Sequence, residues 1–517
     1  MRFGIDFGTT RVVVALVDRG NFPLVNFEAP DGQVHDWFPP VAAVNGSRRV
    51  YGWEAIAAQE DEEWTVLRSL KRALRTANPH TEISAAGQRI PLRTLMAEMM
   101  MALKSHLLEH SNAGTDAASG PEEKLEVMLG VPANANSNQR FLTEEAAQAA
   151  GFTVLGLLNE PSAAAIEFAH RNRAERKSRV GTGLVVYDLG GGTFDVSLVT
   201  IGETEHTVVA TDGIASLGGD DFDVLLSDLV IEEVEKAAKG RVRLKAAERF
   251  RLLEECREKK ESLTANTRKL TIDLDRVRAG LGLVTIAVDD YYERCRPLIE
   301  QTRFVVEDLL EGHTDQQLDT LYVTGGAAEL PPVARILRES FGRKVRRSAY
   351  MRSASAIGLA IRASDDMAEQ GADHVQEQFN RNFGLWRETD HGGTIFFDLI
   401  FPRGVQLPSS SEQPLRVERI YRPAHNIGHF RYLESSQLDE QMQPKGEISN
   451  WDQILFPFDV ELQKHSDLAT VPVALMPNPN GLTIHEEYTC DADGIVRVKI
   501  HAEPGGFART YTIGQGS

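Results

Sequence analysis

The sequence predicts an α/β fold with a duplicated unit, followed by a smaller all-β segment. Two stretches carry this prediction, FGIDFGTTRVVVALVD at residues 3–18 and VVYDLGGGTFDVSL at residues 185–198. Each reads as a strand, an aspartate, a glycine turn and a second strand, so each can begin one half of a duplicated domain. The aspartates are Asp6 and Asp188. After residue 383 the composition changes to short β-prone runs such as LRVERIYRP and GIVRVKIHA, which predict the all-β segment.

The glycine turns predict a site for a metal-bound polyphosphate. The glycines at 190–192 can adopt positive φ and expose backbone N–H groups, so such a turn can close around an anion. Asp188 and Asp195 flank this turn and would repel a naked phosphate, so we expect a divalent cation between them and the ligand. An ordinary glycine-rich hairpin is the alternative for either stretch alone. The occurrence of two such hairpins favours one phosphate chain held from both sides.

Composition limits the class of partner. The chain has 517 residues, with 56 Lys and Arg against 75 Asp and Glu, a net charge of −19. It contains no Lys/Arg block, so nucleic acid is not expected as a partner. The three cysteines, Cys256, Cys295 and Cys490, are far apart, which favours a reducing cytoplasm over a disulfide framework or a zinc ribbon. No apolar run is long enough to span a bilayer, and Met1 leads directly into a predicted strand, so we expect a soluble protein without a membrane partner.

Helices and strands alternate between the two hairpins. We expect a helical region over residues 53–75, which contains Lys71, and an amphipathic helix within residues 91–110. His106, Glu109 and His110 on the second helix have the H-x-x-E-H order of one zinc protease class. No third ligand lies nearby in the sequence, and a solvated helix end is the simpler interpretation.

Glu160 begins the next feature of interest. A strand near residues 126–132, a helix over 137–150 and a strand over 153–158 precede the segment NEPSAAAIEFA, which starts at Asn159. A polar residue ahead of a proline-started, alanine-rich run is typical of a helix N-terminus. The Glu160 carboxylate could there reach a metal or a water beside the phosphates, or it could simply favour the helix dipole.

Two further glycine pairs follow the second hairpin. Gly218 and Gly219 precede an acidic amphipathic helix, and a charged helical stretch covers residues 245–263. The strand TLYVTGG ends in Gly325 and Gly326 ahead of another helix, an arrangement that can bind a phosphate or a sugar edge. The sequence has neither a G-x-x-x-x-G-K-[ST] loop nor a G-x-G-x-x-G fingerprint, which excludes the commonest nucleotide folds.

The β-rich C-terminal part begins after a polar, acidic stretch at residues 364–382, which we predict to be a linker or a solvated helix. NPNG and DADG are hairpin turn signals within it. DADG also opens like a calcium loop, but the spacing after Gly494 does not fit one.

Six motifs now point to a family. GIDFGTT, VPANANSNQR, LLNEPSAAAIEFA, VVYDLGGGTFDVSLV, SLGGDDFD and LYVTGGAAELP occur in this order, and together they resemble the ATPase domain of the heat-shock 70 kDa, DnaK-type chaperones. The resemblance covers residues 1–363. It continues more weakly through 394–514, notably in FDLIFPRGVQLP and DADGIVRVKI, which look like that family's β-sandwich peptide-binding domain. It implies an actin-like ATPase of two lobes around a cleft at 1–363, a linker at 364–382 and an all-β sandwich at 383–517.

The resemblance also implies ATP or ADP with Mg²⁺, slow ATP hydrolysis and a role for each matching residue. Asp6 and Asp188 match the pair that holds Mg²⁺ through its waters, and both also belong to the catalytic set. Lys71 matches the lysine that places the attacking water, Glu160 matches the carboxylate near the metal, and Thr193 completes the catalytic set. The predicted nucleotide-binding residues are Gly8, Thr9, Thr10, Gly190, Gly191, Gly192, Thr193, Asp195, Gly218, Gly219, Lys260, Thr264, Gly325 and Gly326.

The base end of the predicted site departs from the family pattern. The two arginines that sandwich the adenine in the family align with Glu261 and Glu329, a serine near the base aligns with Ala327, and an aspartate aligns with Arg352. A carboxylate lacks the cation that a guanidinium presents to a ring face. We therefore expect weaker adenine binding or relaxed base choice, with Arg257 and Arg352 as candidates to replace the missing arginines.

Two departures concern regulation. ADHVQEQFNRNFG at residues 372–384 replaces the family's leucine-rich linker, and Gln148 stands where the family has an arginine that docks J-proteins. The chain stops soon after the last predicted strand, so we expect no helical lid and rapid, weak peptide exchange.

Three functions fit these features. The first is an ATP-regulated chaperone that acts in protein folding and the stress response, binds unfolded or extended polypeptide and has a co-chaperone or exchange factor as a further partner. The second is a nucleotide-dependent binding protein with little turnover that recruits a dedicated partner. The third, a sugar or acetate kinase on the same scaffold, leaves the C-terminal β segment unexplained. The intact catalytic set favours the first.

Overall fold

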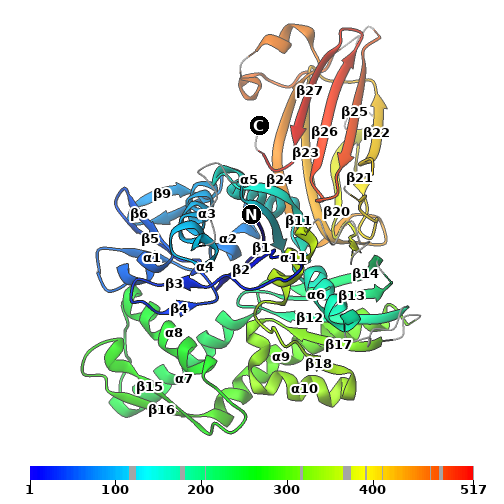
Figure 1. The fold of residues 1–517 in the computed structure, drawn as a ribbon. Coiled ribbons are helices and arrows are strands. Elements are labelled where there is room, and N and C mark those ends of the chain that lie inside the picture. Colours follow the sequence, from blue (N-terminus) through cyan, green and yellow to red (C-terminus); the bar gives the residue numbers. More distant parts are fainter. Residues whose placement is uncertain are drawn as a thin grey trace.

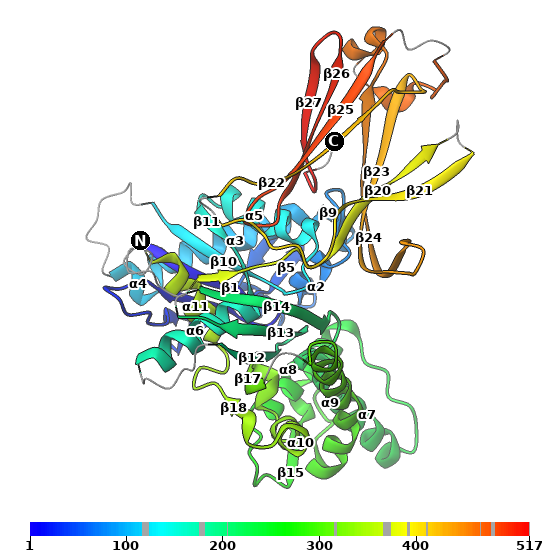
Figure 2. The same cartoon turned by 90° about the vertical axis from the view of Figure 1, so that its right-hand side faces the viewer.

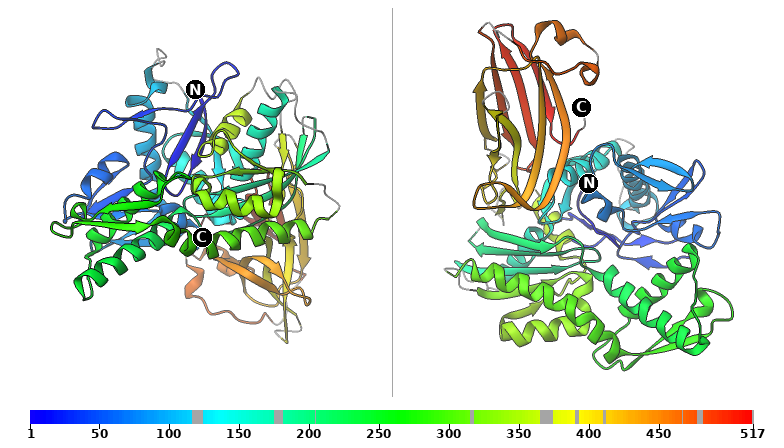
Figure 3. Two further views of the ribbon diagram at one scale, coloured as in Figure 1. Left: turned by 90° about the horizontal axis from the view of Figure 1, so that it is seen from below. Right: turned by 180° about the vertical axis from the view of Figure 1, so that it is seen from behind.

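The computed structural model of the chain describes residues 1–115, 124–174, 181–203, 205–314, 318–364, 374–389, 393–409, 412–465, 467–476 and 481–515. Two lobes form one body, and a β-sandwich formed by the C-terminal part stands on top of them (Figures 1 and 2). The views from below and from behind show the same three parts (Figure 3).

The first lobe is built on a four-stranded sheet with the order β11-β10-β1-β2. Its strands are β1 (Arg2–Phe7), β2 (Val12–Leu16), β10 (Glu126–Val131) and β11 (Thr153–Asn159). β1 pairs antiparallel with β2 and parallel with β10, and β10 pairs parallel with β11. α3 (Leu92–Glu109) and α5 (Ser137–Ala149) pack their apolar residues against this sheet in one core. The remaining elements of this lobe are β3 (Phe27–Glu28), β4 (Val34–His35), β5 (Ala42–Asn45), β6 (Arg48–Tyr51), α1 (Trp53–Ala58), β7 (Thr65–Leu67), α2 (Leu70–Leu74), β8 (Glu82–Ala85), β9 (Gln88–Pro91) and α4 (Asn112–Thr115).

The second lobe repeats this strand pattern. Its sheet has the order β18-β17-β12-β13-β14-β19, with β12 (Thr182–Leu189), β13 (Phe194–Ile201), β14 (Glu205–Ile214), β17 (Leu318–Thr324), β18 (Val345–Arg347) and β19 (His374–Gln376). β12 pairs antiparallel with β13 and parallel with β17, which pairs parallel with β18, as β1 does with β2, β10 and β11. The duplication predicted from the two hairpins is therefore confirmed. The other elements are α6 (Glu160–Ala174), α7 (Gly219–Ala238), α8 (Ala246–Glu261), β15 (Lys269–Asp273), η1 (Leu274–Arg276), β16 (Leu283–Ala287), α9 (Val288–Glu311), η2 (Gly326–Glu329), α10 (Pro331–Phe341), η3 (Gly342–Lys344) and α11 (Ala354–Ala363).

Two helices join the lobes. α6 and α11 share a buried apolar core with both central sheets. A Cβ at Gly4 of β1 would lie 2.2 Å from the Ala360 backbone nitrogen, and one at Gly358 would lie 1.8 Å from the Ala163 carbonyl oxygen. Only glycine allows such close approach of α11 to β1 and to α6, so these positions bring the two sheets together.

The C-terminal part is a sandwich of two four-stranded antiparallel sheets, β21-β20-β23-β24 and β22-β25-β26-β27. Its strands are β20 (Asn382–Thr389), β21 (Thr394–Phe401), β22 (Leu415–Tyr421), β23 (Ile427–Leu438), β24 (Pro444–Pro457), β25 (Thr483–Cys490), β26 (Val496–Glu503) and β27 (Phe507–Thr512), with short 3₁₀ turns η5 (Val460–Lys464) and η6 (Leu468–Thr470). Buried and exposed residues alternate along β26, which is the period that a two-layer sandwich requires. The predicted α/β fold with an actin-like two-lobed domain and an all-β sandwich is confirmed.

One predicted element is wrong. Residues 53–75 form two short helices, α1 and α2, separated by the strand β7, rather than one helical region. Val66 and Thr65, both β-branched, place β7 against β5. Lys71 therefore lies on a helix of only five residues.

The segment between the lobes and the sandwich is described in part. Of the predicted linker at 364–382, residues 365–373 lie outside the described residues. β19 then adds to the second lobe's sheet by pairing parallel with β14, and β20 starts at Asn382.

All three cysteines are free and buried. None of the described helices combines the length and the apolar character needed to cross a lipid bilayer.

Candidate functional site

The two predicted hairpin turns face each other. A Cβ at Gly191 would lie 2.5 Å from Cγ2 of Thr10, and one at Gly192 would lie 2.5 Å from Oγ1 of Thr9. The turn between β1 and β2 and the turn between β12 and β13 are thus in van der Waals contact. The two glycines allow this contact, because any larger side chain would separate the turns.

A cleft between the lobes begins at this junction. The predicted site residues that line it are Asp6, Gly8, Thr9, Thr10, Lys71, Glu160, Asp188, Gly190, Gly191, Thr193, Gly219, Lys260, Gly325 and Gly326. The predicted residues of the described chain outside its lining are Gly192, Asp195, Gly218 and Thr264. Gly218 lies directly behind the turn, since its Cβ would be 2.6 Å from the Gly191 backbone. Thr264 lies in an exposed turn after α8, where it contacts Thr267.

Lys71 and Glu160 form a buried ion pair within the cleft. α2 supplies Lys71, and Glu160 begins α6 directly after β11, so the pair joins two separate elements of the structure. Burial acts to lower the pKa of Lys71, but the charges of Glu160 and Asp6 outweigh burial and raise that pKa. Lys71 is therefore a permanently charged group inside the cleft.

The carboxylates at the junction carry excess negative charge. Burial and then the Glu160 charge raise the pKa of Asp6 to about 7, although Lys71 opposes this shift. The same two causes raise the pKa of Asp195 to about 7, and they hold the pKa of Asp188 well above its ordinary value. One lysine does not neutralise this group of acids.

The chemistry of these residues fits a divalent metal ion. Oδ1 of Asp6 is buried and has no hydrogen-bond partner, although buried oxygens normally have one. Gly325 has φ +90° and lies so close to Asp188 that a Cβ there would be 2.5 Å from Oδ1 of Asp188. The backbone at Gly325 is therefore packed against this carboxylate. Mg²⁺ prefers oxygen ligands and keeps several waters. Asp6 and Asp188 would hold such an ion, and it would offset the charge that raises their pKa values.

Backbone hydrogen bonds order the glycine turn between β12 and β13. Gly190 donates its N–H to the Thr193 carbonyl at 3.0 Å, which closes the turn. The N–H groups of Gly219 and Asp220 donate to the carbonyls of Gly190 and Gly191 at 2.9 and 2.8 Å. The start of α7 thus supports the turn between β12 and β13 from behind.

The other end of the cleft has a charge pattern that the sequence only partly suggested. Arg352 donates through Nε to Glu329 at 2.8 Å and through Nη1 to Glu261 at 3.1 Å. Arg11 from the first lobe pairs with the same Glu261 and lies 4.9 Å from the Trp37 ring centroid. One arginine is therefore held between the two carboxylates that align with the family's adenine-binding arginines.

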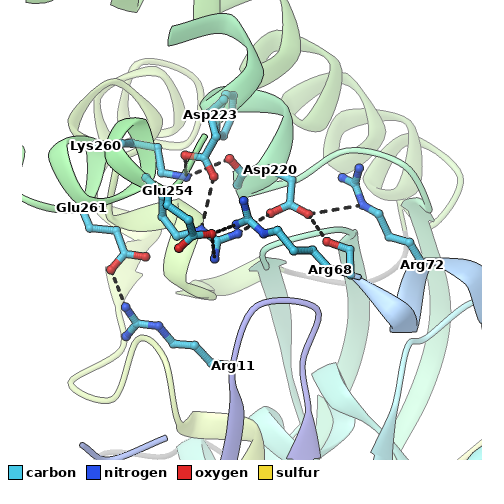
Figure 4. Close-up of polar contacts among 12 residues, drawn as sticks. Arg11, Arg68, Arg72, Asp220, Asp223, Glu254, Lys260 and Glu261 are labelled. Atoms are coloured by element: carbon cyan, nitrogen blue, oxygen red, sulfur yellow. Dashed lines mark hydrogen bonds and ion pairs between the residues drawn. The ribbon is translucent and has the colours of Figure 1, made fainter. Parts of the chain in front are cut away.

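Ion pairs cross the cleft beside this site (Figure 4). They include Arg11–Glu261, Arg68–Glu254 at 2.7 Å and Arg72–Asp221 at 2.6 Å. In each pair the arginine belongs to the first lobe and the carboxylate to α7 or α8 of the second. These pairs hold the cleft closed, because separation of the lobes must break all three.

Lys260 (Figure 4) and Arg257, both on α8, occupy the second lobe's side of the same region. Lys260 donates to the Gly219 carbonyl at 2.8 Å and pairs with Asp223 at 2.7 Å. Arg257 pairs with Asp220 at 3.1 Å and with Glu254 at 3.5 Å. Both cations line the cleft.

A second cavity, of about 160 Å³, adjoins the cleft at Lys71. Thr9, Lys71 and Thr193 line both spaces. The far wall of this cavity comes from the sandwich, through residues that include Arg381 and Ser449. The site is thus in contact with the C-terminal part of the chain.

Hydrogen bonds tie the segment that enters the sandwich to residues adjacent to the site. Asn159, the neighbour of Glu160, donates its backbone N–H to Glu377 at 3.2 Å and its side-chain amide to the same carboxylate at 2.5 Å. Ala133 donates its N–H to Asp195 at 3.1 Å, and its carbonyl accepts a hydrogen bond from Asn380. Both routes connect a buried carboxylate of the site to the segment that enters the sandwich.

The sequence did not single out these contacts or the ion pairs across the cleft. A signal existed for the ion pairs, since RSLKRALR places basic residues beside Lys71 and SLGGDDFD is acidic. The DADG turn also has a different role from a calcium loop: Asp493 accepts a hydrogen bond from the Leu157 N–H at 2.7 Å. Its partner element is the first lobe's edge strand, β11.

The zinc-protease spacing is not supported by the described structure. His106 donates through Nδ1 to the Ala102 carbonyl at 3.0 Å, and its ring packs against Phe38 and His110. His106 is thus held by packing and a backbone hydrogen bond near the end of α3, instead of the solvated helix end given as the alternative.

Two duplicated lobes around a cleft with an acidic, lysine-bearing floor define an actin-like nucleotide-binding fold. Comparison with known proteins identifies the family. The Hsp70 protein family model matches residues 2–376. The chaperone protein DnaK of Thermotoga petrophila is 30% identical over 518 residues, covering 96% of this chain and 77% of that protein. This chain belongs to the Hsp70 family of chaperones, whose members bind ATP and ADP.

Other relatives are longer than the part they share with this chain. The chaperone protein HscA homolog of Laribacter hongkongensis is 32% identical over 432 residues, which are 79% of this chain and 65% of that protein. The chaperone protein DnaK of Thermus thermophilus is 29% identical over 392 residues, which are 71% of this chain and 61% of that protein. The chain therefore spans less than two thirds of the length of these two chaperones.

The raised carboxylate pKa values predict how stability depends on pH. The folded-state pKa of Asp6 is about 7 against an ordinary 3.8, so the folded chain holds a proton that the unfolded chain releases. The contribution of protonated Asp6 to the free energy of unfolding is complete below its ordinary pKa of 3.8, and it is lost as the pH rises through the folded-state pKa of about 7. Without metal and nucleotide, we expect the melting temperature to fall from pH 5 to pH 8. Asp6→Asn should remove the contribution of Asp6 to that fall, which corresponds to on the order of 2 kcal/mol of unfolding free energy.

Differential scanning fluorimetry across this range measures the effect. Asp18→Asn is the matched control, because the Asp18 side chain is 54% exposed. Equal pH dependence in wild type, Asp6→Asn and the control would contradict the assignment of excess charge to this junction.

Proposed function

We propose that this chain is a Mg²⁺-dependent ATPase of the chaperone type that binds extended polypeptide under nucleotide control. The observation that carries the proposal is the buried Lys71–Glu160 pair in a cleft that Asp6 and Asp188 also line. Phosphoryl transfer to water requires charge neutralisation and positioning more than covalent chemistry. A fixed ammonium, two metal-binding carboxylates and two glycine turns supply these needs.

Each residue has a separate part in this proposal. The backbone N–H group of Gly191 and the hydroxyls of Thr9, Thr10 and Thr193 bind the phosphate oxygens, while the N–H group of Gly190 closes the turn. The Lys71 ammonium orients the attacking water and offsets developing negative charge, and Glu160 holds that ammonium in place. A bound Mg²⁺ supplies further charge neutralisation to the phosphates.

The base end supports a modified adenine site. Arg352, held by Glu329 and Glu261, is the cation that lines the cleft beside Gly326, and its Cγ lies 3.7 Å from the position of a Cβ on Gly326. A single guanidinium can stack on any base. We therefore infer weaker and less selective base binding than two flanking arginines would give. This feature also favours the second candidate, a binding protein with little turnover.

Contacts between the lobes and the sandwich support nucleotide control. Regulation requires contacts that differ between two global states. Glu377 is hydrogen-bonded to Asn159, the sequence neighbour of Glu160, and Asn380 is hydrogen-bonded to Ala133, which binds Asp195. A change at the phosphate end of the cleft can therefore alter the position of the sandwich. Gln148, at the position matched to J-protein docking, is exposed and donates to Glu144 at 2.8 Å. We propose no J-protein contact there.

The proposed polypeptide site is a cavity of about 1220 Å³ in the sandwich, lined by residues of β20, β21, β22 and β23. Trp386, Ile395, Phe396 and Ile420 are exposed apolar residues along it. Backbone edges and apolar side chains are the features that bind an extended segment. The three free thiols of the chain also agree with a reducing cytoplasm as the compartment in which the protein acts.

The cavity also carries positive charge. Arg387 and Arg419 are paired with Asp398. Arg422 and Arg431 are exposed and have no ion-pair partner in the described part of the chain. Charged groups at the rim of a site select complementary partners, so we propose that the preferred segment contains acidic residues beside apolar ones.

Lys71→Ala tests the hydrolytic proposal. We expect single-turnover ATP hydrolysis to slow by about 100-fold, while nucleotide binding persists because the turns and the metal-binding carboxylates remain. The exposed Lys236→Ala is the control. Unchanged hydrolysis in Lys71→Ala would refute the role of this lysine.

Calorimetric titration with ADP and GDP tests the base site. We expect the two dissociation constants to lie within about tenfold of each other, a difference of about 1.4 kcal/mol, and Arg352→Ala to weaken both by roughly fivefold. The exposed Arg338→Ala should change neither. Strong preference for ADP that survives Arg352→Ala would overturn the inference.

Peptide anisotropy tests the cavity. Two labelled peptides share an apolar centre and carry either flanking Glu or flanking Lys residues. We expect the acidic peptide to bind more tightly, and Arg422→Glu with Arg431→Glu to reverse that preference. A control with the same charge change, Arg241→Glu with Arg346→Glu, alters exposed arginines of the second lobe. If the two double variants behave alike, the cavity does not select charge.

A further inference from the structure

A group of metal-ligating side chains lies on the outer face of the sandwich, far in sequence from the cleft residues. His485 is on β25, and His501 and Glu503 are on β26. Their neighbours Ile484, Ile500 and Ala502 point into the core instead. Since successive residues of a strand face opposite sides, the two histidines and the glutamate share the solvent side.

Strand register brings the three side chains together. His485 lies directly opposite His501 in the β25–β26 pair, and Glu503 is two residues further along the same face. The Glu503 carboxylate lies 3.6 Å from Nε2 of His485 and 3.6 Å from Nε2 of His501. All the candidate ligand atoms lie within 4.8 Å of one another.

We propose that His485, His501 and Glu503 form a binding site for a divalent transition-metal ion of the Zn²⁺ type. Two imidazole nitrogens and one carboxylate are a three-ligand set that zinc accepts, with water as the fourth ligand. Imidazole ligands select zinc, nickel or copper over Mg²⁺. This site therefore differs from the cleft, where Asp6 and Asp188 offer only oxygen ligands.

Glu418 on β22 strengthens the assignment. Its Oε1 lies 3.5 Å from Nδ1 of His485. A carboxylate that accepts the Nδ1 proton of a histidine leaves the Nε2 lone pair free for a metal and fixes the ring orientation. His485 is thus prepared to bind through the nitrogen that faces Glu503.

Charge at this face also favours a cation. Glu418 and Glu503 pair only with histidines among the described residues. The nearby arginines Arg416 and Arg497 are engaged by Glu487 and Asp491. Neither carboxylate forms an ion pair with Lys or Arg in the described part of the chain, although Lys499 lies two residues from His501 on the same face of β26.

Metal binding requires the two histidine rings to turn. They are stacked, with centroids 4.5 Å apart and planes 13° from parallel. A shared metal ion about 2.0–2.1 Å from each nitrogen requires the rings to tilt toward each other. Rotation about the second side-chain torsion of histidine is soft, and His485 and His501 retain 18% and 24% exposure. A bound ion would link β25 to β26.

Zinc titration of the full chain tests the proposal. The assay uses isothermal calorimetry with Mg²⁺ and ADP present, so that the cleft carboxylates are occupied. We expect wild type to bind one more Zn²⁺ per chain, in the micromolar range, than the double variant His485→Gln with His501→Gln. Glu418→Gln should weaken this ion by about 10-fold or more. Co²⁺ should give the intense visible bands of a four-coordinate site in wild type only.

Two controls keep the test decisive. His313→Gln with His465→Gln removes two histidines outside the cluster and should leave stoichiometry and affinity unchanged. Glu503→Gln, at a side chain that is 61% exposed, tests the site if the double histidine variant does not fold, and we expect at least a tenfold loss of affinity. Equal zinc binding by wild type and the cluster variants would overturn the proposal.

Discussion

Excess negative charge buried where the two hairpins meet is the constraint on which the rest of the structure depends. Asp6, Asp188, Asp195 and Glu160 surround a single lysine, Lys71, and burial raises the pKa of each aspartate. A buried carboxylate without a partner is costly. The junction therefore favours a proton or a metal cation. Asp6 belongs to the first lobe and Asp188 to the second, so a cation held by both carboxylates would link the lobes.

The same junction explains why the C-terminal sandwich sits where it does. Residues adjacent to Glu160 and Asp195, namely Asn159 and Ala133, provide the hydrogen bonds that hold Glu377 and Asn380. The strand β19 lies on the edge of the second lobe's sheet beside them. A few short covalent and hydrogen-bonded connections thus join the site to the attachment of the sandwich, and they are the physical basis of the nucleotide control proposed above.

Prediction from sequence succeeded where the signal was local. Each hairpin is a continuous run of residues, and its alternation and glycines specify two strands and a turn. Even there, local patterns have limits: residues 53–75 resembled a helix, but β7 forms in their middle because β5 offers it a partner strand. The ion pairs across the cleft could also be predicted only in part. The sequence shows basic residues near Lys71, but it does not indicate that Arg68 pairs with Glu254.

The sequence by itself determined the class of fold, the duplication and the acidic and glycine residues that gather at the cleft, because these depend on short-range periodicity and on motifs that are continuous in the chain. Only the tertiary structure decided which charges meet. Arg352 is held between Glu329 and Glu261, and His485 lies opposite His501. Such contacts depend on lobe closure and strand register, which are set by the packing of many residues distant in sequence.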